Sequence, residues 1–429
     1  MSGDTSRGRG ARSSRPPADP GAGGFEPRVA ARRRTASRWR FGFLASTFVG
    51  IIVLAALLFN VADRAFGYVA VEVKRAPETI AFQGTPLADL DAAGVAGLIT
   101  AEVSKNVVRR MNRDRPLVER SRRELRAIVE ERIVDARVVH AWSLTDSLFR
   151  SDDVRRERAA DYPQAHLTFR SWLTPSFITT PQNPRPELAG VRTAILGSLW
   201  MIAITILFAF PVGVGAAVYL EEYARRDNPF GRLIQTNINN LAGVPSIIYG
   251  MLGLVILVRV LRPLTSGAWF GVADAASANG RTILSAGLTL GLLILPVLII
   301  NGQEAIRAVP LSLRQASYGL GATKWQTIWH HVLPSALPGV LTGTILAISR
   351  ALGETAPIIV IGASTFLQQD PTGPFSSFTA LPIQIYQWTS RPEDTFRSIA
   401  AAAILVLLAL LLTLNATAVL LRNRYQAKG

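Results

Sequence analysis

The stretch QASYGLGATKWQTIWHHVLP, residues 315–334, is a short polar segment between two apolar runs of membrane length. Its residues fit two short helices, and Gly321 stands where a turn would join them, because glycine reaches backbone conformations that other residues avoid. We therefore predict a helix–turn–helix loop outside the bilayer. A membrane protein that keeps such a compact loop is expected to use it for contact with another protein.

The apolar runs on either side extend to a set of predicted membrane spans. A hydrocarbon core of ~30 Å needs about 20 apolar residues in a helix, and a helix satisfies its own backbone polar groups there. Pro357 interrupts the fifth run, so a single straight helix is least expected there. One run could instead be a buried helix of soluble type. The six runs are Phe41–Val61, Ala194–Leu220, Leu241–Leu261, Thr282–Ile300, Leu337–Phe366 and Ile399–Leu421.

Basic residues indicate which side of the membrane each loop faces. Ten arginines fall between Arg7 and Arg40, just before the first apolar run, and cytoplasmic segments carry an excess of Lys and Arg. The N-terminus is therefore predicted in the cytoplasm, and six crossings return the C-terminus there. The net charge of +16 then reflects topology, and no nucleic-acid partner is expected. Other basic residues on predicted inner segments are Arg225, Arg226 and Arg232, then Arg307, Arg314 and Lys324, then Arg422, Arg424 and Lys428.

The predicted fold class is an all-α polytopic membrane protein with six transmembrane helices and a mainly helical extracytoplasmic insertion. The N-terminal tail is rich in Arg, Gly, Pro and Ser, which favours disorder, and its charged part is too long for a cleavable signal peptide. The predicted divisions are a basic cytoplasmic tail at 1–40, the first transmembrane helix at 41–61, an extracytoplasmic domain and linker at 62–190, and a transmembrane domain at 191–425 with its inner loop at 302–336.

Within the extracytoplasmic region, apolar residues recur at helical spacing. They are Leu125, Ile128, Val129, Ile133 and Val134. The charged residues between them are expected to form a solvated face. A phosphate-binding patch is the alternative, built from Arg120, Arg122 and Arg123. The chain contains no cysteine, so neither disulfides nor cysteine-based metal sites contribute.

Two charged residues, Arg350 and Glu354, are predicted in the interior of the fifth run. A charge at the centre of a membrane helix costs about 3 kcal/mol and commonly faces a bundle interior or a water-filled path. At i and i+4 the two share a helix face. The fork of donors on Arg350 suits a transported oxyanion, with Glu354 tuning its charge or gating the path. The alternative is a structural ion pair that holds the helix bundle together.

The third run opens with Asn240-Leu-Ala-Gly243-Val-Pro245-Ser246, followed by Ile247 to Gly250. Glycine and proline there permit close helix contact or a local break, and backbone groups freed by a break can line a cavity. Packing and capping at the start of a helix is the alternative explanation.

Residues 315–334 resemble the EAA coupling loop of ABC-importer permeases. Four residues match the pattern of that loop: Ala316, Gly321, Leu333 and Pro334. Three depart from it: Gln315 replaces a Glu, Ser317 an Ala and His331 an Ile. The resemblance implies a type I ABC-importer permease core whose coupling loop docks on an ATPase. Because Gln315 carries no charge, it cannot make the salt bridge that the family's Glu would offer.

The segments 240–250 and 350–357 resemble the permeases of high-affinity phosphate ABC importers, the PstA type more closely than the PstC type. The resemblance covers about residues 187–425, in a long form with an extra extracytoplasmic domain. It implies phosphate transport across the bacterial inner membrane. It also places Arg350 and Glu354 in the translocation path, and Asn240, Gly243, Pro245 and Ser246 near it. The implied partners are a PstC-type permease, two ATP-binding subunits, an extracytoplasmic phosphate-binding protein and membrane lipids.

The sequence lacks a glycine-rich loop ending in Gly-Lys-Ser/Thr, so this chain is not expected to be an enzyme. ATP would be used by partner subunits, and no cofactor or metal is expected on the chain itself. Two other functions stay open. One is a permease for another oxyanion or small solute. The other is a membrane phosphate sensor or scaffold, in which residues 62–190 bind a ligand without transport.

Overall fold

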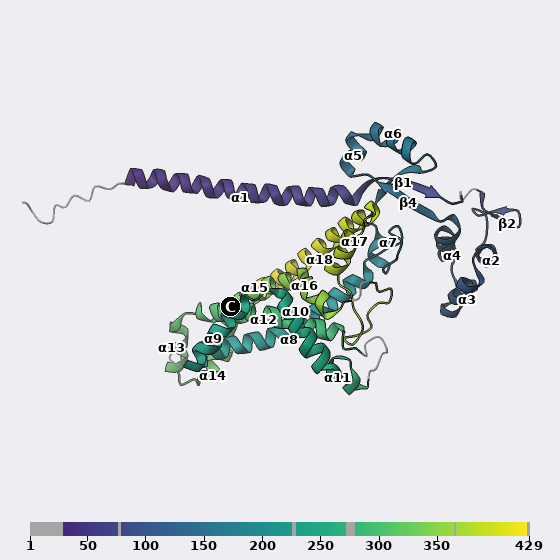
Figure 1. Cartoon of the computed structure of the whole chain (residues 1–429). Helices are drawn as coiled ribbons and strands as arrows, with labels where there is room; N and C mark the ends of the chain where they lie inside the picture. Colours follow the sequence, from purple (N-terminus) through teal and green to yellow (C-terminus); the bar gives the residue numbers. More distant parts are fainter. Residues whose placement is uncertain (1–28, 76–78, 225–228, 272–278, 364–365, 427–429) are drawn as a thin grey trace, which may run out of the picture. The chain divides into compact units, whose positions relative to one another are not determined.

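The structure is a computed structural model that describes residues 29–75, 79–224, 229–271, 279–363 and 366–426 (Figure 1). The chain divides into two compact units, Met1–Leu58 and Phe59–Gly429. Arg225, Arg226 and Lys428, counted above as inner basic residues, lie outside the described residues, as do residues 1–28 of the N-terminal tail.

The first unit consists, in its described part, of the start of helix α1 (Val29–Ala65). Its apolar side chains from Phe41 onward are exposed, and the rings of Trp39 and Phe43 stack with centroids 5.8 Å apart. An apolar surface of this kind fits a helix surrounded by lipid. The helix starts twelve residues before Phe41, so residues 29–40, predicted to be disordered, are helical.

Five of the described helices are long and apolar enough to span a membrane, and a bent helix pair brings the number to six. The predicted spans are therefore present, with two changes. The third is bent by 105° between α9 (Pro229–Ala242) and α10 (Ser246–Gly253). The fifth ends at Gly353, and a short helix, α16 (Ala356–Ile361), follows after a break.

Four further helices account for the other spans, and they lie together in Figure 1. Small residues let them approach closely, as in other membrane helix pairs. A Cβ added at Gly287 or Gly291 of α12 would come within 3 Å of α8 side chains. The four helices are α8 (Arg192–Val218), α12 (Ile283–Arg307), α15 (Leu333–Gly353) and α18 (Asp394–Gln426). Shorter elements beside them are Leu254–Val260, α11 (Arg262–Thr265), Ala268–Phe270 and α17 (Leu381–Thr389).

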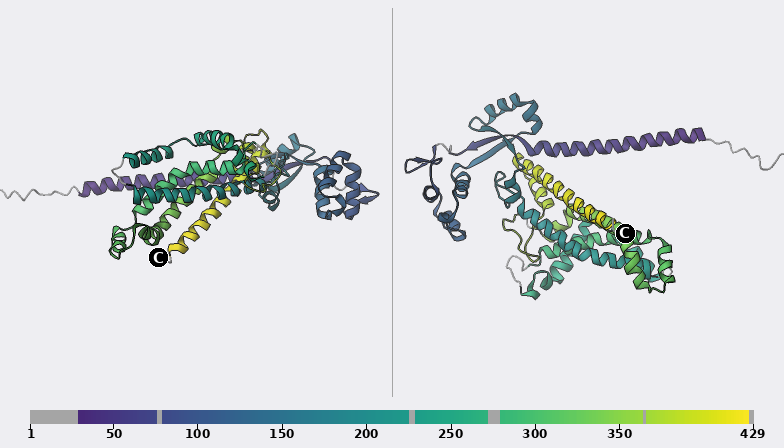
Figure 2. Two further views of the ribbon diagram at one scale, coloured as in Figure 1. Left: turned by 90° about the horizontal axis from the view of Figure 1, so that it is seen from below. Right: turned by 180° about the vertical axis from the view of Figure 1, so that it is seen from behind.

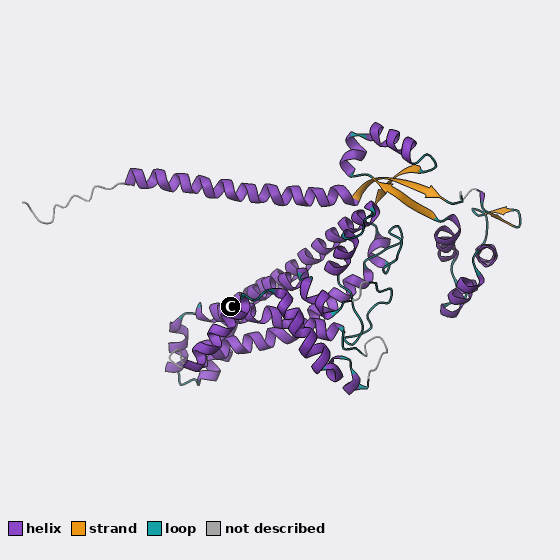
Figure 3. Ribbon diagram, viewed as in Figure 1, coloured by secondary structure: helices purple, strands orange, loops and turns teal. Residues whose placement is uncertain are grey.

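The insertion contains a three-stranded antiparallel sheet that the sequence reading missed (Figure 3). Strand β1 (Phe66–Val73) continues directly from α1 and lies between β4 (Ala136–Ala141) and β5 (His166–Ser171). Phe66 pairs with Ser171, and Val71 pairs with His166. The rest of the insertion is mainly helical, as predicted. It contains α2 (Ala92–Glu102), α3 (Lys105–Asp114), α4 (Arg122–Val129), α5 (Leu144–Phe149), α6 (Ser151–Asp161), α7 (Pro175–Thr179), and the short strands β2 (Ala81–Phe82) and β3 (Thr85–Pro86).

Helices α2 to α4 enclose a small core of their own. The five apolar residues predicted to line a helical face, from Leu125 to Val134, are all buried in it. The alternative reading of a phosphate-binding arginine patch is not supported. Arg120 donates to the carbonyls of Met111 and Arg115, and Arg122 donates to that of Ala88. These two guanidinium groups hold loops together, and the side chain of Arg123 lies outside the described part.

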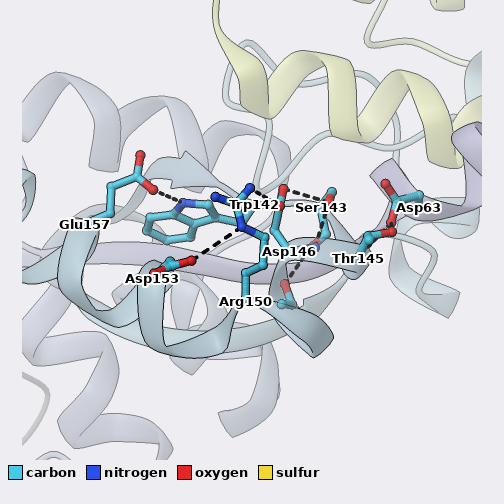
Figure 4. A network of polar contacts seen from close by, with 9 residues as sticks. Asp63, Trp142, Ser143, Thr145, Asp146, Arg150, Asp153 and Glu157 are labelled. Carbon is cyan, nitrogen blue, oxygen red and sulfur yellow. Dashed lines mark hydrogen bonds and ion pairs between the residues drawn. The ribbon is translucent and has the colours of Figure 1, made fainter.

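A polar network joins the end of α1 to the start of α5, just after β4 (Figure 4). Both the backbone N–H and the hydroxyl of Thr145 donate to one carboxylate oxygen of Asp63, each at 2.6 Å. Trp142 donates its indole N–H to Glu157 at 3.0 Å. The base of the insertion is thus fixed to the last turns of α1 within the second unit.

The two ends of α8 belong to different surroundings. At its start, Ala194 shares a core with Val69 and Trp172 of the insertion. At its end, Ala217 shares a core with Ile306 and Val332 of the 302–336 region. At 1.5 Å per residue, these ends lie about 35 Å apart along the helix, comparable with a bilayer core of ~30 Å. The insertion and the coupling loop therefore lie at opposite ends of a membrane span, as the three views show (Figures 1 and 2).

Candidate translocation site and coupling loop

The segment 315–334 forms the predicted helix–turn–helix. Helix α13 (Leu311–Gly319) is followed by a turn and by α14 (Lys324–Thr327), after which residues Ile328–Val332 lead into α15. Gly321 has φ +82°, in the left-handed region that glycine adopts without strain. Thr323 and Gln326 then form a reciprocal capping box at the start of α14.

The residues that depart from the EAA pattern differ in their surroundings. Gln315 is exposed, like Ala316 beside it. Ser317 is buried, and its hydroxyl lies 2.9 Å from that of Thr327. Thr327 donates its own proton to the carbonyl of Thr323, so Ser317 is the donor to Thr327. The serine therefore ties α13 to α14, a contact that alanine could not make. Leu333 is half-buried, and Pro334 is exposed in the first turn of α15.

The coupling loop also exposes large apolar side chains. Leu320 at the turn is 91% exposed, and the rings of Trp325 and Trp329 stack at 5.6 Å while remaining exposed. Exposed apolar surface of this kind marks a site of contact with another protein or a membrane. The sequence reading did not single out these residues, although two tryptophans in a polar loop were an available signal.

Arg350 and Glu354 were predicted in the interior of a helix, but they lie at its end. Arg350 is in the last turn of α15, and Glu354 is the residue just after it. The helix ends here, and α16 begins at Ala356 with Thr355 before it and Pro357 in its first turn, where proline is well tolerated. The Arg350 Nε lies 3.3 Å from Glu354 Oε1, with side chains 47% and 19% exposed. The pair therefore stands at the break between α15 and α16.

The 240–250 segment forms the bend between α9 and α10. The N–H of Gly243 donates to the carbonyl of Asn240 at 3.0 Å, Pro245 precedes the first turn of α10, and Ser246 begins it. Asn240 and Gly243 are exposed. The hydroxyl of Tyr249 donates to the carbonyl of Leu241 at 2.8 Å and so bridges the bend. The local break that glycine and proline permit is present.

These two segments meet, although about 100 residues separate them. A Cβ added at Gly250 would lie 2.6 Å from the Cα of Pro357, so α10 and α16 are in backbone contact. Tyr249 packs in one cluster with Ala347 and Ala351 of α15, and it is close enough to Arg350 for an electrostatic interaction. The bend and the charged pair thus belong to one region of the helix bundle.

Residues 209–426, slightly more than half of the chain, match the family described as the binding-protein-dependent transport system inner membrane component. The chain belongs to this family. It is accordingly a multi-pass membrane permease of an ABC importer, and the matched residues include both the coupling loop and the Arg350 region.

Several curated relatives are about one third identical to this permease over the aligned residues. The "Probable ABC transporter permease protein YqgI" of Bacillus subtilis is 34% identical over 52% of this chain and 69% of its own length. The "Phosphate transport system permease protein PstA 1" of Mycobacterium tuberculosis is 34% identical over 56% and 72%. The "Phosphate transport system permease protein PstC" of Xylella fastidiosa is 34% identical over 52% and 70%. Relatives of both the PstA and the PstC type are therefore similar to this permease.

The permease also has contacts that the sequence reading did not foresee. Tyr219–Tyr223 continues α8 as a short π-helical turn, which contains Glu221 and Glu222. In the structure, Glu221 pairs with Arg307 at 2.9 Å and Glu222 pairs with Arg314 at 2.8 Å. Within the described residues, no three side chains that could hold a metal ion lie together. His330 and His331 are exposed in the coupling loop.

Proposed function

We propose that this permease is one of two membrane subunits of an ATP-driven importer for inorganic phosphate, in the PstA-type role. Two ATP-binding subunits would dock on the coupling loop and hydrolyse ATP, and the chain itself would need no cofactor. A PstC-type permease would complete the path, and an extracytoplasmic phosphate-binding protein would deliver the substrate.

The observation that carries the proposal is the meeting of the two phosphate-importer segments around Arg350. Arg350 uses its Nε for Glu354, and its two Nη groups make no hydrogen bond among the described residues. Such a fork of donors suits the oxygens of a phosphate ion. Glu354 lowers the net positive charge, which would keep the anion from binding too tightly to leave. Printed names of relatives such as PstA 1 and PstC support phosphate as the substrate.

The proposed orientation places both termini in the cytoplasm of a bacterial cell, in the inner membrane. The coupling loop would then face the cytoplasm, where ATP is available, and the insertion would lie outside. Their positions at opposite ends of α8 support this assignment. The exposed Leu320, Trp325 and Trp329 supply the apolar contact surface that an ATPase needs. ATP-driven movement of that ATPase would tilt the spans joined to the loop and open the path alternately to each side.

Transport by membrane vesicles tests the proposal. The chain would be reconstituted with its second permease, its ATPase and its binding protein, and ATP-dependent uptake of radiolabelled phosphate measured. We expect Arg350→Ala to abolish uptake and Arg350→Lys, which keeps the charge but loses the fork, to retain part of it. Gly353→Ala, one turn away, serves as the control, because its new Cβ would have no other part of the chain within 4 Å. Normal uptake by an assembled Arg350→Ala complex would rule out the role assigned to Arg350.

A further inference from the structure

Three consecutive residues at the end of α8 each contact a cation of the coupling region. Glu221 accepts hydrogen bonds from Arg307 at the end of α12, at 3.0 and 2.9 Å. Glu222 accepts from Arg314 of α13, at 3.1 and 2.8 Å. The ring of Tyr223 lies 4.9 Å from the ammonium of Lys324 of α14. The cations that were counted only as inner-face charges are thus the points at which the coupling loop is fastened to α8.

The Glu222–Arg314 pair is the most enclosed of these contacts. Its side chains are 8% and 12% exposed, whereas Arg307 of the neighbouring pair is 60% exposed. Arg314 also donates to the carbonyl of Val309 at 2.7 Å and to that of Ile306 at 2.9 Å. Ile306 is in the last turn of α12, and Val309 follows the end of that helix. One guanidinium group therefore joins the ends of α8 and α12 to the first coupling helix.

We infer that the Glu222–Arg314 pair is a permanent mechanical link, through which movement of the coupling loop is passed to α8 and α12. This inference rests on the proposed function, because it assumes that an ATPase moves the loop. Opening the pair would leave the buried Glu222 carboxylate without this partner and the buried Arg314 guanidinium without its counter-charge, which is unfavourable in an enclosed site. The loop and the two helix ends therefore move as one body. Glu222 and Arg314 are positioning residues that act through the loop, and neither needs to touch the substrate.

A reversible bridge can test this link, because the chain contains no cysteine. The full complex would carry Glu222→Cys together with Arg314→Cys, and a reducible bis-thiosulfonate reagent would join the two introduced thiols. Phosphate uptake and ATP hydrolysis would be measured before bridging, after bridging and after reduction. The matched control is Glu221→Cys with Arg307→Cys, a pair that joins the same turn to α12 and whose arginine is 60% exposed, although Glu221 itself is 8% exposed. Co-purification of the ATPase shows whether each variant assembles.

We expect the unbridged 222/314 variant to hydrolyse ATP while its uptake falls at least tenfold, so that more ATP is used per phosphate moved. Bridging should restore at least half of wild-type uptake, and reduction should remove it again. The control pair should stay within twofold of wild type throughout. A merely structural role would lower uptake and ATP hydrolysis together and leave their ratio unchanged.

Three results would overturn the inference: unbridged uptake at the wild-type rate, a bridge that restores nothing, or a bridge that stops residual uptake. The last would mean that the loop and α8 separate during transport. If the introduced thiols prevent assembly, Glu222→Gln keeps the side-chain shape and removes its charge, and we expect at least a threefold loss of uptake per ATP. An unchanged ratio in Glu222→Gln would also contradict the link. A wild-type complex that takes up no phosphate would instead contradict the proposed substrate.

Discussion

The contact between Gly250 and Pro357 gives a prediction whose size can be worked out. In Gly250→Ala the new Cβ would lie 2.6 Å from the Cα of Pro357, 2.8 Å from its carbonyl oxygen and 3.1 Å from its carbonyl carbon. Carbon atoms pack at about 3.5–4.0 Å, so α10 and α16 must separate by about 1 Å. The obstacle is backbone, which cannot rotate away as a flexible side chain could.

Two opposing effects decide the outcome. Replacing glycine by alanine inside a helix gains about 1 kcal/mol in helix propensity. Overpacking a tight contact costs about 1–3 kcal/mol. The cost prevails in most of that range, and we expect a net loss of about 1 kcal/mol. Because Pro357 follows Arg350 and Glu354 so closely, the shift should also disturb the charged pair and reduce phosphate uptake.

Thermal unfolding of the detergent-solubilised complex, with uptake by vesicles, would measure both effects. The matched control is Gly215→Ala in α8. Its new Cβ would have no other part of the chain within 4 Å, so this variant should be as stable as wild type or more so. If Gly250→Ala is as stable as Gly215→Ala and transports normally, α10 and α16 are not in backbone contact, and the reasoning that places Arg350 beside the bend is wrong.

Three other changes test separate parts of the structure. Gly321→Ala should cost about 1–2 kcal/mol at φ +82° and weaken co-purification of the ATPase, whereas Gly319→Ala, with no positive φ, should not. Ser317→Ala removes the hydrogen bond to Thr327 and should lower thermal stability by about 1 kcal/mol, while a wild-type melting curve would argue against that bond. Hydrogen bonds from Ser121 lower the pKa of Glu124 below 4.5, so its stabilising effect is present above pH 4.5 and is lost as pH falls through the lower folded-state value. The stability difference between wild type and Glu124→Ala should therefore shrink on acidification, and a difference that grows would contradict this sign.

The sequence predicted those features that depend on local pattern. Apolar runs of sufficient length located the spans, because the bilayer requires them. Gly321 predicted the turn of the coupling loop, because only its backbone conformation suits a left-handed φ. Pro357 correctly indicated that the fifth run would not be one straight helix. The sequence did not show that the helix stops at Gly353, four residues before Pro357.

Features that depend on distant contacts were missed. Glu222 and Arg314 are 92 residues apart, and each alone reads as an ordinary charge at a membrane surface. Their pairing follows from the packing of α8 against α12, which no local pattern encodes. Strand β1 was missed for a different reason. Its residues, Phe66–Val73, are rich in aromatic and β-branched side chains that favour a strand, but they follow a membrane helix without a break, which hid this signal.

The most direct test of the central claim is a transport measurement with competing anions. Vesicles that contain this permease and its partner subunits would be supplied with labelled phosphate and with unlabelled sulfate, molybdate or tungstate in excess. The account predicts ATP-dependent accumulation of phosphate that unlabelled phosphate suppresses and the other oxyanions do not. Accumulation of another solute in place of phosphate, or none at all by a fully assembled complex that hydrolyses ATP, would contradict it.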